Sequence, residues 1–270
     1  MLISIGDRVL PGSYELHSRF ARVANYTRGS RMVSLVTEAI GPGPTRIVVR
    51  STRINSPPTL TVSRRTIALG PKRLRCAGIP QYASRLRPAT PCNLAALERA
   101  LVSHAPPHSL AYLLDDRRMP RAPGFHRALA LHMRLATGRF LDALCEGPQR
   151  CMRGAVKQIA GCGYGLTPSG DDFLAGALLA LRLLNAPASV GARIARAAKT
   201  GNALSNHFIE LAAAGRAPED VKQLATALSA GTPADVSRAA RRVFALGETS
   251  GADLCTGLAL TLRAFTRNEI

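Results

Sequence analysis

The residues best suited to chemistry lie in one stretch, 161–172, which reads Gly-Cys-Gly-Tyr-Gly-Leu-Thr-Pro-Ser-Gly-Asp-Asp and leads into the apolar run 173–181. Glycine at every second position leaves no Cβ in the way and permits φ > 0, so the backbone amides can approach a ligand closely. The first turn of a following helix adds unpaired N–H groups and a partial positive charge. The stretch therefore predicts a cradle for an anion or a carboxylate, with two adjacent carboxylates at its lip.

A second copy of the motif lies near the C-terminus, because residues 250–262 align without gaps on residues 169–181. Both copies begin Ser-Gly, carry Asp at the fourth position and Gly at the eighth, and continue with an apolar face. Ser-x-x-Asp before an apolar run is also the pattern of a capping box. For Asp172 and Asp253, a capping role and a ligand-binding role therefore both stay open. Capping does not explain Asp171 or the alternating glycines, so we expect the two helix N-termini to meet at one pocket.

The chemistry of the motif side chains suggests their roles. Carboxylates can accept hydrogen bonds from an amide or amine, or hold Mg²⁺ through water, so the cofactor stays open and no metal-ligating residue is assigned. The predicted catalytic residues are Asp171 and Asp172. The predicted ligand-binding residues are Gly163, Gly165, Thr167, Ser169, Gly170, Ser250, Gly251, Asp253 and His17.

Other polar residues are weaker candidates. His17, with Asn25 further along the chain, could face a cleft, although a single histidine there is more often an exposed group. The segments 199–202 and 205–207 form a polar helix start that is either another wall of the pocket or a cap. The sequence has no Gly-x-Ser-x-Gly nucleophile elbow and no P-loop, and the alternating glycines lack the βαβ context of a dinucleotide fingerprint. Four histidines show no partner pattern: His104, His108, His126 and His132.

The chain carries 36 Lys and Arg against 17 Asp and Glu, a formal charge of +19. Such an excess would suit nucleic acid, but the basic residues are scattered and no recognisable nucleic-acid-binding motif accompanies them. Aromatic residues make up only 4% and tryptophan is absent, so platforms for stacking bases are scarce. We therefore expect small anionic ligands, and not nucleic acid, as partners.

The cysteines and the apolar runs bear on the compartment. The six cysteines form no Cys-x-x-Cys pair, and no histidine stands at metal-ligand spacing from them, so a structural zinc site is not expected. Residues 1–8 lack a basic leader and a cleavable apolar stretch. The longest apolar run, 173–181, is far short of the about 20 residues that a membrane span needs. We expect a cytoplasmic protein with reduced thiols and no membrane partner.

The side-chain pattern changes near residue 85. Before it, β-branched segments such as 31–37, separated by turn clusters, predict a small antiparallel sheet or barrel of four to six strands. After it, apolar spacing predicts helices, including a long one over 125–145 that Gly138 could break. The other predicted helices span 93–103, 149–160, 170–185, 189–200, 203–214, 218–230, 234–246 and 252–266. We expect an α+β protein with a β-rich N-terminal domain, 1–85, and a larger, mainly α-helical domain, 86–270.

The run 161–172 with the Phe-Leu-Ala-Gly after it resembles the signature Gly-x-Gly-Pro-Gly-Leu-Thr-Pro-Ser-Gly-Asp-Asp of a bacterial family long catalogued as a domain of unknown function. That family includes the AllH-type subunit of oxamate carbamoyltransferase, from anaerobic allantoin catabolism. The similarity extends to Leu16-His-Ser-x-Phe20 with Asn25, and to Gly-x-x-Ser-Gly-x-Asp at 247–253. Tyr164 stands where the family usually has proline. The resemblance implies a subunit that acts with two other proteins to interconvert oxalurate and oxamate plus carbamoyl phosphate.

Two interpretations of function remain open. In the first, the chain is a subunit of a carbamoyltransferase-like complex and binds a small carboxylate, amide or phosphate ligand. Carbamoyl transfer needs positioning and charge stabilisation more than a protein nucleophile, so the missing triad does not count against this interpretation. In the alternative, the chain is a non-catalytic metabolite-binding or scaffold subunit that docks partner proteins.

Overall fold

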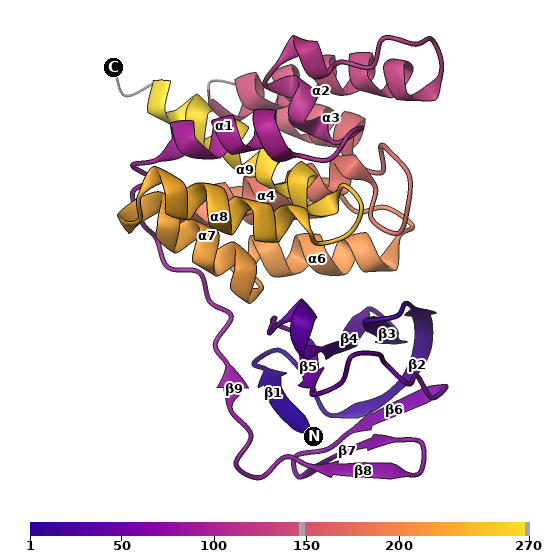
Figure 1. The fold of residues 1–270 in the computed structure, drawn as a ribbon. Coiled ribbons are helices and arrows are strands. Elements are labelled where there is room, and N and C mark those ends of the chain that lie inside the picture. Colours follow the sequence, from indigo (N-terminus) through magenta and orange to yellow (C-terminus); the bar gives the residue numbers. More distant parts are fainter. Residues whose placement is uncertain (146–148, 268–270) are drawn as a thin grey trace. The chain divides into compact units, whose positions relative to one another are not determined.

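The computed structural model describes residues 1–145 and 149–267, which form two compact units. The first unit contains Met1–Arg85 together with Ala217–Glu219, and the second contains Leu86–Arg216 and Asp220–Ile270. Figure 1 shows that strands build the first unit and helices build the second. The predicted α+β class, with the β-rich part first, is confirmed.

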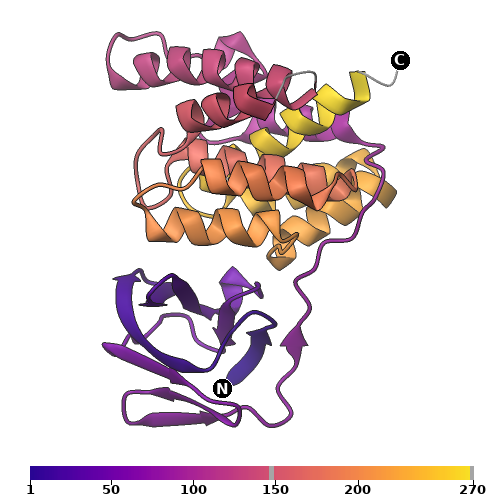
Figure 2. The same ribbon diagram turned by 180° about the vertical axis from the view of Figure 1, so that it is seen from behind.

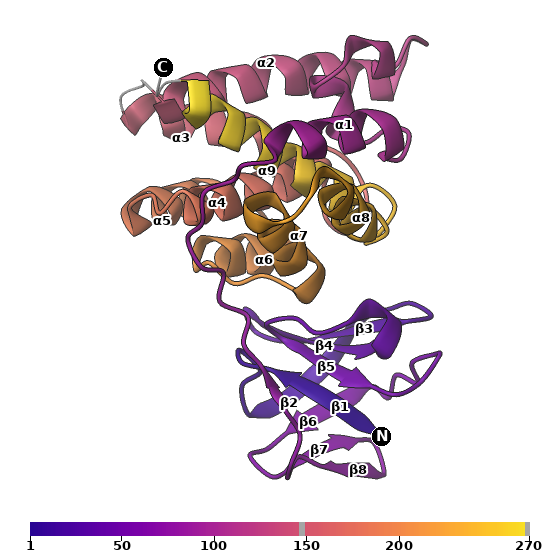
Figure 3. The ribbon, with the colours of Figure 1, turned by 60° about the vertical axis from the view of Figure 1, so that its left-hand side comes forward.

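The first unit is one curled sheet of nine strands, in the order β8-β7-β6-β2-β3-β4-β5-β1-β9 (Figure 3). It is larger than the four to six strands predicted. It is also mixed, because β4 pairs with β5, and β1 with β9, in parallel. The strands are β1 (Leu2–Gly6), β2 (Gly12–Arg19), β3 (Val23–Arg28), β4 (Arg31–Thr37), β5 (Arg46–Val49), β6 (Thr59–Val62), β7 (Thr66–Leu69), β8 (Lys72–Arg75) and β9 (Gln81–Tyr82).

The core of the sheet follows from the alternation of its side chains. In β6, Leu60 and Val62 are buried while the two threonines between and before them are exposed, as a strand with one buried face requires. Tyr14 and Tyr26 are the largest side chains buried in this core. The Tyr26 hydroxyl donates to the carbonyl oxygen of Pro57 at 3.1 Å, which satisfies its polar end.

The helices of the second unit agree with the predicted ranges to within a few residues. The predicted break at Gly138 is wrong, because α2 continues through it. The helices are α1 (Leu94–His104), α2 (Phe125–Cys145), α3 (Gln149–Ile159), α4 (Ser169–Leu183), α5 (Ala188–Ala197), α6 (Ala203–Ala213), α7 (Glu219–Ala230), α8 (Pro233–Phe244) and α9 (Ser250–Arg267). No helix in the described part of the chain combines the length and apolar character that crossing a membrane needs.

The two helices that carry the repeated motif, α4 and α9, pack against each other in the helical unit, which Figure 2 shows from behind. Nearly every residue of α4 is buried, as expected of a helix that is apolar on all sides. A Cβ added to Gly176 would lie 1.9 Å from the carbonyl oxygen of Leu254, and one added to Gly257 would lie 2.0 Å from that of Phe173. Glycine at both positions therefore permits the close approach of the two helices.

Candidate functional site

The two copies of the motif are structural repeats, each made of a helix, a turn and a second helix. In the first copy α3 leads into α4, and in the second α8 leads into α9. In both, the glycine after the motif serine donates its N–H to a carbonyl oxygen of the preceding turn. Gly170 bonds in this way to Cys162 at 2.8 Å, and Gly251 to Leu246 at 3.0 Å. The repeat seen in the sequence is therefore also a repeat of backbone structure.

Only glycine fits at these two positions, because each lies against the end of the preceding helix. A Cβ on Gly170 would lie 2.0 Å from the carbonyl oxygen of Ile159, and one on Gly251 would lie 1.8 Å from that of Val243. The N–H groups of both glycines, which we expected to face a ligand, are used inside the turns. Gly170 and Gly251 thus position the motif, and the donors for a ligand must come from elsewhere.

The two turns differ in length. A glycine with positive φ precedes the motif serine in both, Gly163 at 118° and Gly247 at 73°. Five residues separate this glycine from the serine in the first copy and two in the second, a difference of three. The longer turn brings Tyr164 and Leu166 to the surface, where they are 40% and 41% exposed. We call residues 161–167 the glycine loop.

Hydroxyl groups join the N-terminal ends of α4 and α9. Thr167 donates its hydroxyl proton to Asp172 Oδ2 at 3.0 Å, and its Oγ1 lies 2.9 Å from Ser250 Oγ. Either hydroxyl can be the donor in the second bond. A chain of hydrogen bonds thus runs from the second copy to the carboxylate of the first. The expected convergence of the two helix N-termini is confirmed, and a shared pocket between them stays a prediction.

Capping does not account for Asp172. Pro168 occupies the N-cap position of α4, and no side chain caps that helix. A true capping box does occur in α8, where Thr232 and Asp235 bond reciprocally. Asp172 instead bonds to Thr167, in the glycine loop. Its carboxylate therefore links the glycine loop to α4 and does not cap the end of that helix.

Asp253 is fully buried and bonds to a segment distant in the sequence. Its Oδ1 accepts the N–H of Leu110 at 2.6 Å. Its Oδ2 makes no hydrogen bond of good geometry with a described residue, although the hydroxyls of Ser169 and Thr249 act on this carboxylate, and the buried hydroxyl of Tyr112 also has no partner among the described residues. The charge of Asp253 acts on Tyr112 and helps to raise the pKa of that phenol, after burial itself. Buried polar atoms nearly always have a partner, so two such atoms in one region are unusual.

The buried side chain of Asp171 bonds to the first residue of the glycine loop. Its Oδ1 accepts the N–H of Gly161 at 2.7 Å. Its Oδ2 is a second buried carboxylate oxygen without a hydrogen bond among the described residues. Asp171 is 2% exposed and Asp172 is 8% exposed, so Asp172 is the more open of the two predicted catalytic carboxylates.

Burial dominates the electrostatics of the three carboxylates. It raises the pKa of Asp253 to about 7, although hydrogen bonds from Leu110 and from two side-chain hydroxyls oppose the rise. Burial, and after it the negative charge of Asp253, raise the pKa of Asp172 well above its ordinary 3.8. Burial also raises the pKa of Asp171. Near neutral pH Asp253 is therefore partly protonated, whereas an exposed aspartic acid has lost its proton.

No basic side chain neutralises this acidic cluster within the described residues. The ion pairs there use other carboxylates, although the chain has 36 Lys and Arg. Across residues 1–145 and 149–267, no group of three or more His, Cys, Asp and Glu is arranged to hold a metal ion. Since buried carboxylates need a donor or a proton, an N–H group of a ligand is a suitable partner for them.

Backbone donors lie beside these acceptors, in the glycine loop. The N–H groups of residues 163–167, which include the predicted Gly163, Gly165 and Thr167, donate to no described residue. Asn202 holds the loop by donating from Nδ2 to the carbonyl oxygen of Leu166 at 2.8 Å. Thr167 thus joins this partly exposed loop to the buried carboxylate of Asp172.

The other predicted residues divide between the two units. Ser169 is buried at the start of α4. Asn202 caps α6, accepting the N–H groups of residues 204 and 205 at 3.1 Å, which confirms the capping interpretation, and it also contacts the glycine loop. That this cluster forms a wall of the pocket stays a prediction. His17 is exposed in β2 of the other unit, at an irregularity in the pairing with β3. Its ligand-binding role stays a prediction.

Sequence reasoning misses two histidines that the fold brings to the glycine loop. The rings of His108 and His126 stack with centroids 4.3 Å apart, and the ring of Tyr164 lies 5.5 Å from that of His126. Phe125 completes the group, 6.0 Å from Tyr164. The two histidines lie 18 positions apart in a proline-rich stretch and at a helix start, a spacing that matches no known motif. We call these four rings the ring cluster.

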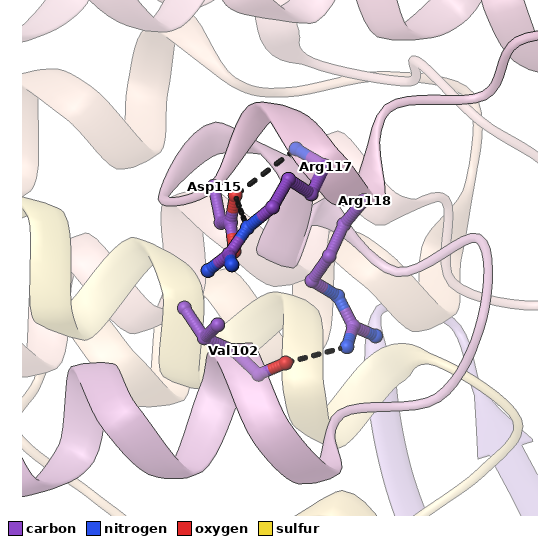
Figure 4. Close-up of polar contacts among 4 residues, drawn as sticks. All are labelled: Val102, Asp115, Arg117 and Arg118. Atoms are coloured by element: carbon purple, nitrogen blue, oxygen red, sulfur yellow. Dashed lines mark hydrogen bonds and ion pairs between the residues drawn. The ribbon is translucent and has the colours of Figure 1, made fainter.

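An arginine anchors the segment that carries His108 and Leu110. Arg118 donates to the carbonyl oxygen of Val102 at 2.7 Å (Figure 4). It also donates to the carbonyl oxygens of Ala105 at 2.5 Å and Pro106 at 3.2 Å. It thereby satisfies carbonyls at the C-terminal end of α1 and just beyond it, which have no intrahelical partner. The segment is therefore fixed at one end by Arg118 and at the other by Asp253.

We expect Arg118→Ala to loosen this segment, because three carbonyl oxygens lose their donor at a cost of about 1–3 kcal/mol. The amide of Leu110 should then exchange faster in hydrogen–deuterium exchange. Arg117→Ala is the matched control, since the Arg117 side chain is 84% exposed and pairs only with Asp115 in this loop (Figure 4). Equal exchange at Leu110 in the two variants would contradict the anchoring role.

Comparisons with known proteins agree with the sequence resemblance. The family model described as oxamate carbamoyltransferase subunit AllH matches residues 159–262. This range begins at the last residue of α3 and ends within α9, so it contains both copies of the motif. Comparisons with curated proteins and with solved structures gave no match.

Proposed function

We propose that the chain is a subunit of a carbamoyltransferase that binds a small carboxylate, amide or phosphate ligand where α4, α9 and the glycine loop meet. The match to the AllH subunit family over both motif copies supports a carbamoyltransferase subunit. The reaction we assign is the interconversion of oxalurate plus phosphate with oxamate plus carbamoyl phosphate. Two further protein subunits would be its partners.

The observation that carries the proposal is the juxtaposition of acceptors and donors at Thr167. On one side lies Asp172, beside Asp171 and Asp253, which each have one buried oxygen without a hydrogen bond; none of the three has a basic partner among the described residues. On the other lie loop amides that donate to no described residue. Oxamate and carbamoyl phosphate each have an N–H₂ end and an anionic end. The first suits the carboxylates, and the second suits the loop amides.

The raised pKa values suit these carboxyl groups to general acid–base catalysis. When phosphate oxygen attacks the carbamoyl carbon of oxalurate, the carbon–nitrogen bond breaks and the departing oxamate nitrogen takes up a proton. A carboxylic acid that is still protonated near neutral pH can supply that proton, and the carboxylate left behind can accept a proton in the reverse direction. Asp253, with a pKa of about 7, and Asp172 are the groups we assign to this transfer. Asp171 positions the loop.

The test is the rate of carbamoyl phosphate formation by the complex reconstituted from all its subunits. Asp172→Asn keeps the size of the side chain and removes its proton transfer, so we expect a rate about 100-fold lower. Asp142→Asn, which changes an exposed carboxylate on α2, is the matched control and should leave the rate unchanged. Wild-type rates for Asp172→Asn would reject the proposed role.

One observation favours the alternative, a metabolite-binding or scaffold subunit without catalytic residues. Asp253 has no exposed surface, so it would reach a substrate only if the loop or the 105–110 segment moves. In that case the complex should keep its rate when Asp253 is changed, yet lose it when the whole subunit is left out. Measuring both separates the two functions.

A further inference from the structure

The ring cluster lies beside the loop whose amides we assign to the anionic end of the ligand. Tyr164 belongs to that loop, and its ring contacts both His126 and Phe125. The four rings come from three separate segments: the turn before η2 (Leu110–Leu113), the start of α2, and the glycine loop. Phe125 is 58% exposed and Tyr164 40% exposed, although exposed aromatic rings are scarce in this chain.

The backbone holds His108 in an unusual conformation. Its φ is 64°, in the left-handed region that residues other than glycine seldom adopt, and such a conformation persists only when the surroundings impose it. Arg118 bonds to the carbonyl oxygens of Ala105 and Pro106 just before His108, and Leu110 just after it bonds to Asp253. The segment that presents the His108 ring is thus held on both sides.

We propose that His108 and His126 donate hydrogen bonds to the oxyanion of the ligand at the mouth of the site, where the Tyr164 ring packs against His126. This inference rests on the proposed function for its choice of a phosphate-like anion. Each imidazole has at least one N–H donor, whatever its protonation state. In the described structure, neither histidine has a hydrogen bond or an ion pair; the contacts of both are with rings.

The surroundings support an anion-binding role for these donors. The acidic cluster and the loop amides include no basic side chain, so an anionic ligand would otherwise meet only backbone and hydroxyl donors. Glu248 is the opposing group: its negative charge, like that of Asp253, raises the pKa of Tyr164, after burial. Glu248 is exposed, so solvent screens its repulsion of an anion.

The test follows the imidazole resonances of the full chain by NMR while inorganic phosphate is added. We expect the signals of His108 and His126 to shift together and saturably, and those of His104 and His132 to stay in place. His108→Ala and His126→Ala should each raise the Kd for phosphate at least fivefold, whereas His126→Gln, which keeps an N–H donor, should recover most of the affinity. His104→Ala, an exposed histidine at the end of α1, is the matched control.

Two outcomes would overturn the inference: phosphate that binds without moving either signal, or a His108→Ala, His126→Ala double variant with unchanged affinity. Circular dichroism shows whether each variant is folded, and exposed side chains seldom affect folding. Failure of the proposed function is a separate result. It would appear as a reconstituted complex that forms no carbamoyl phosphate, while phosphate still shifts both histidines of the isolated chain.

Discussion

Asp253→Asn should make the folded protein more stable than the wild type at pH 8, with the difference vanishing near pH 4. The unfolded carboxyl group ionises around its ordinary pKa of 3.8, whereas the buried one does so at about 7. The contribution of this group to stability is therefore full below about pH 4 and is lost as the pH rises through 7. This rise in the pKa corresponds to at most about 4 kcal/mol of stability.

Asparagine removes the titration but keeps the contact, because its side-chain oxygen can still accept the N–H of Leu110. The measurement is the melting temperature of both proteins from pH 4 to pH 8, where we expect a gap of several °C to open in favour of the variant. Asp142→Asn, an exposed carboxylate, is the control and should show a constant gap. If the difference in melting temperature between Asp253→Asn and the wild type were also independent of pH, burial would not raise the pKa of Asp253. The gain in stability should accompany a loss of carbamoyl transfer.

Gly257→Ala should destabilise the helical unit strongly. The added methyl group would lie 2.0 Å from the carbonyl oxygen of Phe173, a backbone atom that cannot move without separating α4 from α9. Overpacking of this kind costs about 1–3 kcal/mol, and more where backbone must shift. The separation would also disturb the contact between Thr167 and Ser250, which joins the two helix ends at 2.9 Å. We therefore expect both stability and activity to fall.

The control for this change is Gly138→Ala in α2, where an added Cβ would meet no atom within 4 Å. Alanine is the better helix former, so this variant should gain up to about 1 kcal/mol. Chemical denaturation measures both changes in the free energy of unfolding. If Gly257→Ala were as stable as Gly138→Ala, that result would contradict the close contact between α9 and the backbone of α4.

The helical part of the fold could be predicted closely from sequence because its signals are local. Apolar spacing and the Gly and Pro residues between helices identify α4 to α9 without any knowledge of their neighbours. The sheet could not be predicted as well. β9 has only two residues, and β8 reads Lys-Arg-Leu-Arg, an edge strand whose charges hide its pattern. The parallel pairs, β4 with β5 and β1 with β9, depend on how distant parts of the chain come together, and no local sequence pattern reveals them.

The candidate site could be predicted only where its signals are local in the sequence. The repeated motif is contiguous, so Thr167, Asp172 and Ser250 could be chosen from spacing alone. The partner of Asp253 could not, because Leu110 stands 143 positions away and bonds through its backbone. The hydrogen bond from the Gly170 N–H to the carbonyl oxygen of Cys162 could not be predicted either, because it depends on the conformation of the turn. The histidines of the ring cluster come together only when the glycine loop is folded.

Hydrogen–deuterium exchange of the glycine loop in the reconstituted complex tests the central claim most directly. The amides of residues 163–167 have no acceptor among the described residues, so they should exchange rapidly without ligand. Adding oxamate and carbamoyl phosphate should slow their exchange at least tenfold, while amides in the sheet of the other unit keep their rates. Turnover by the complex with no protection of these amides would contradict the account.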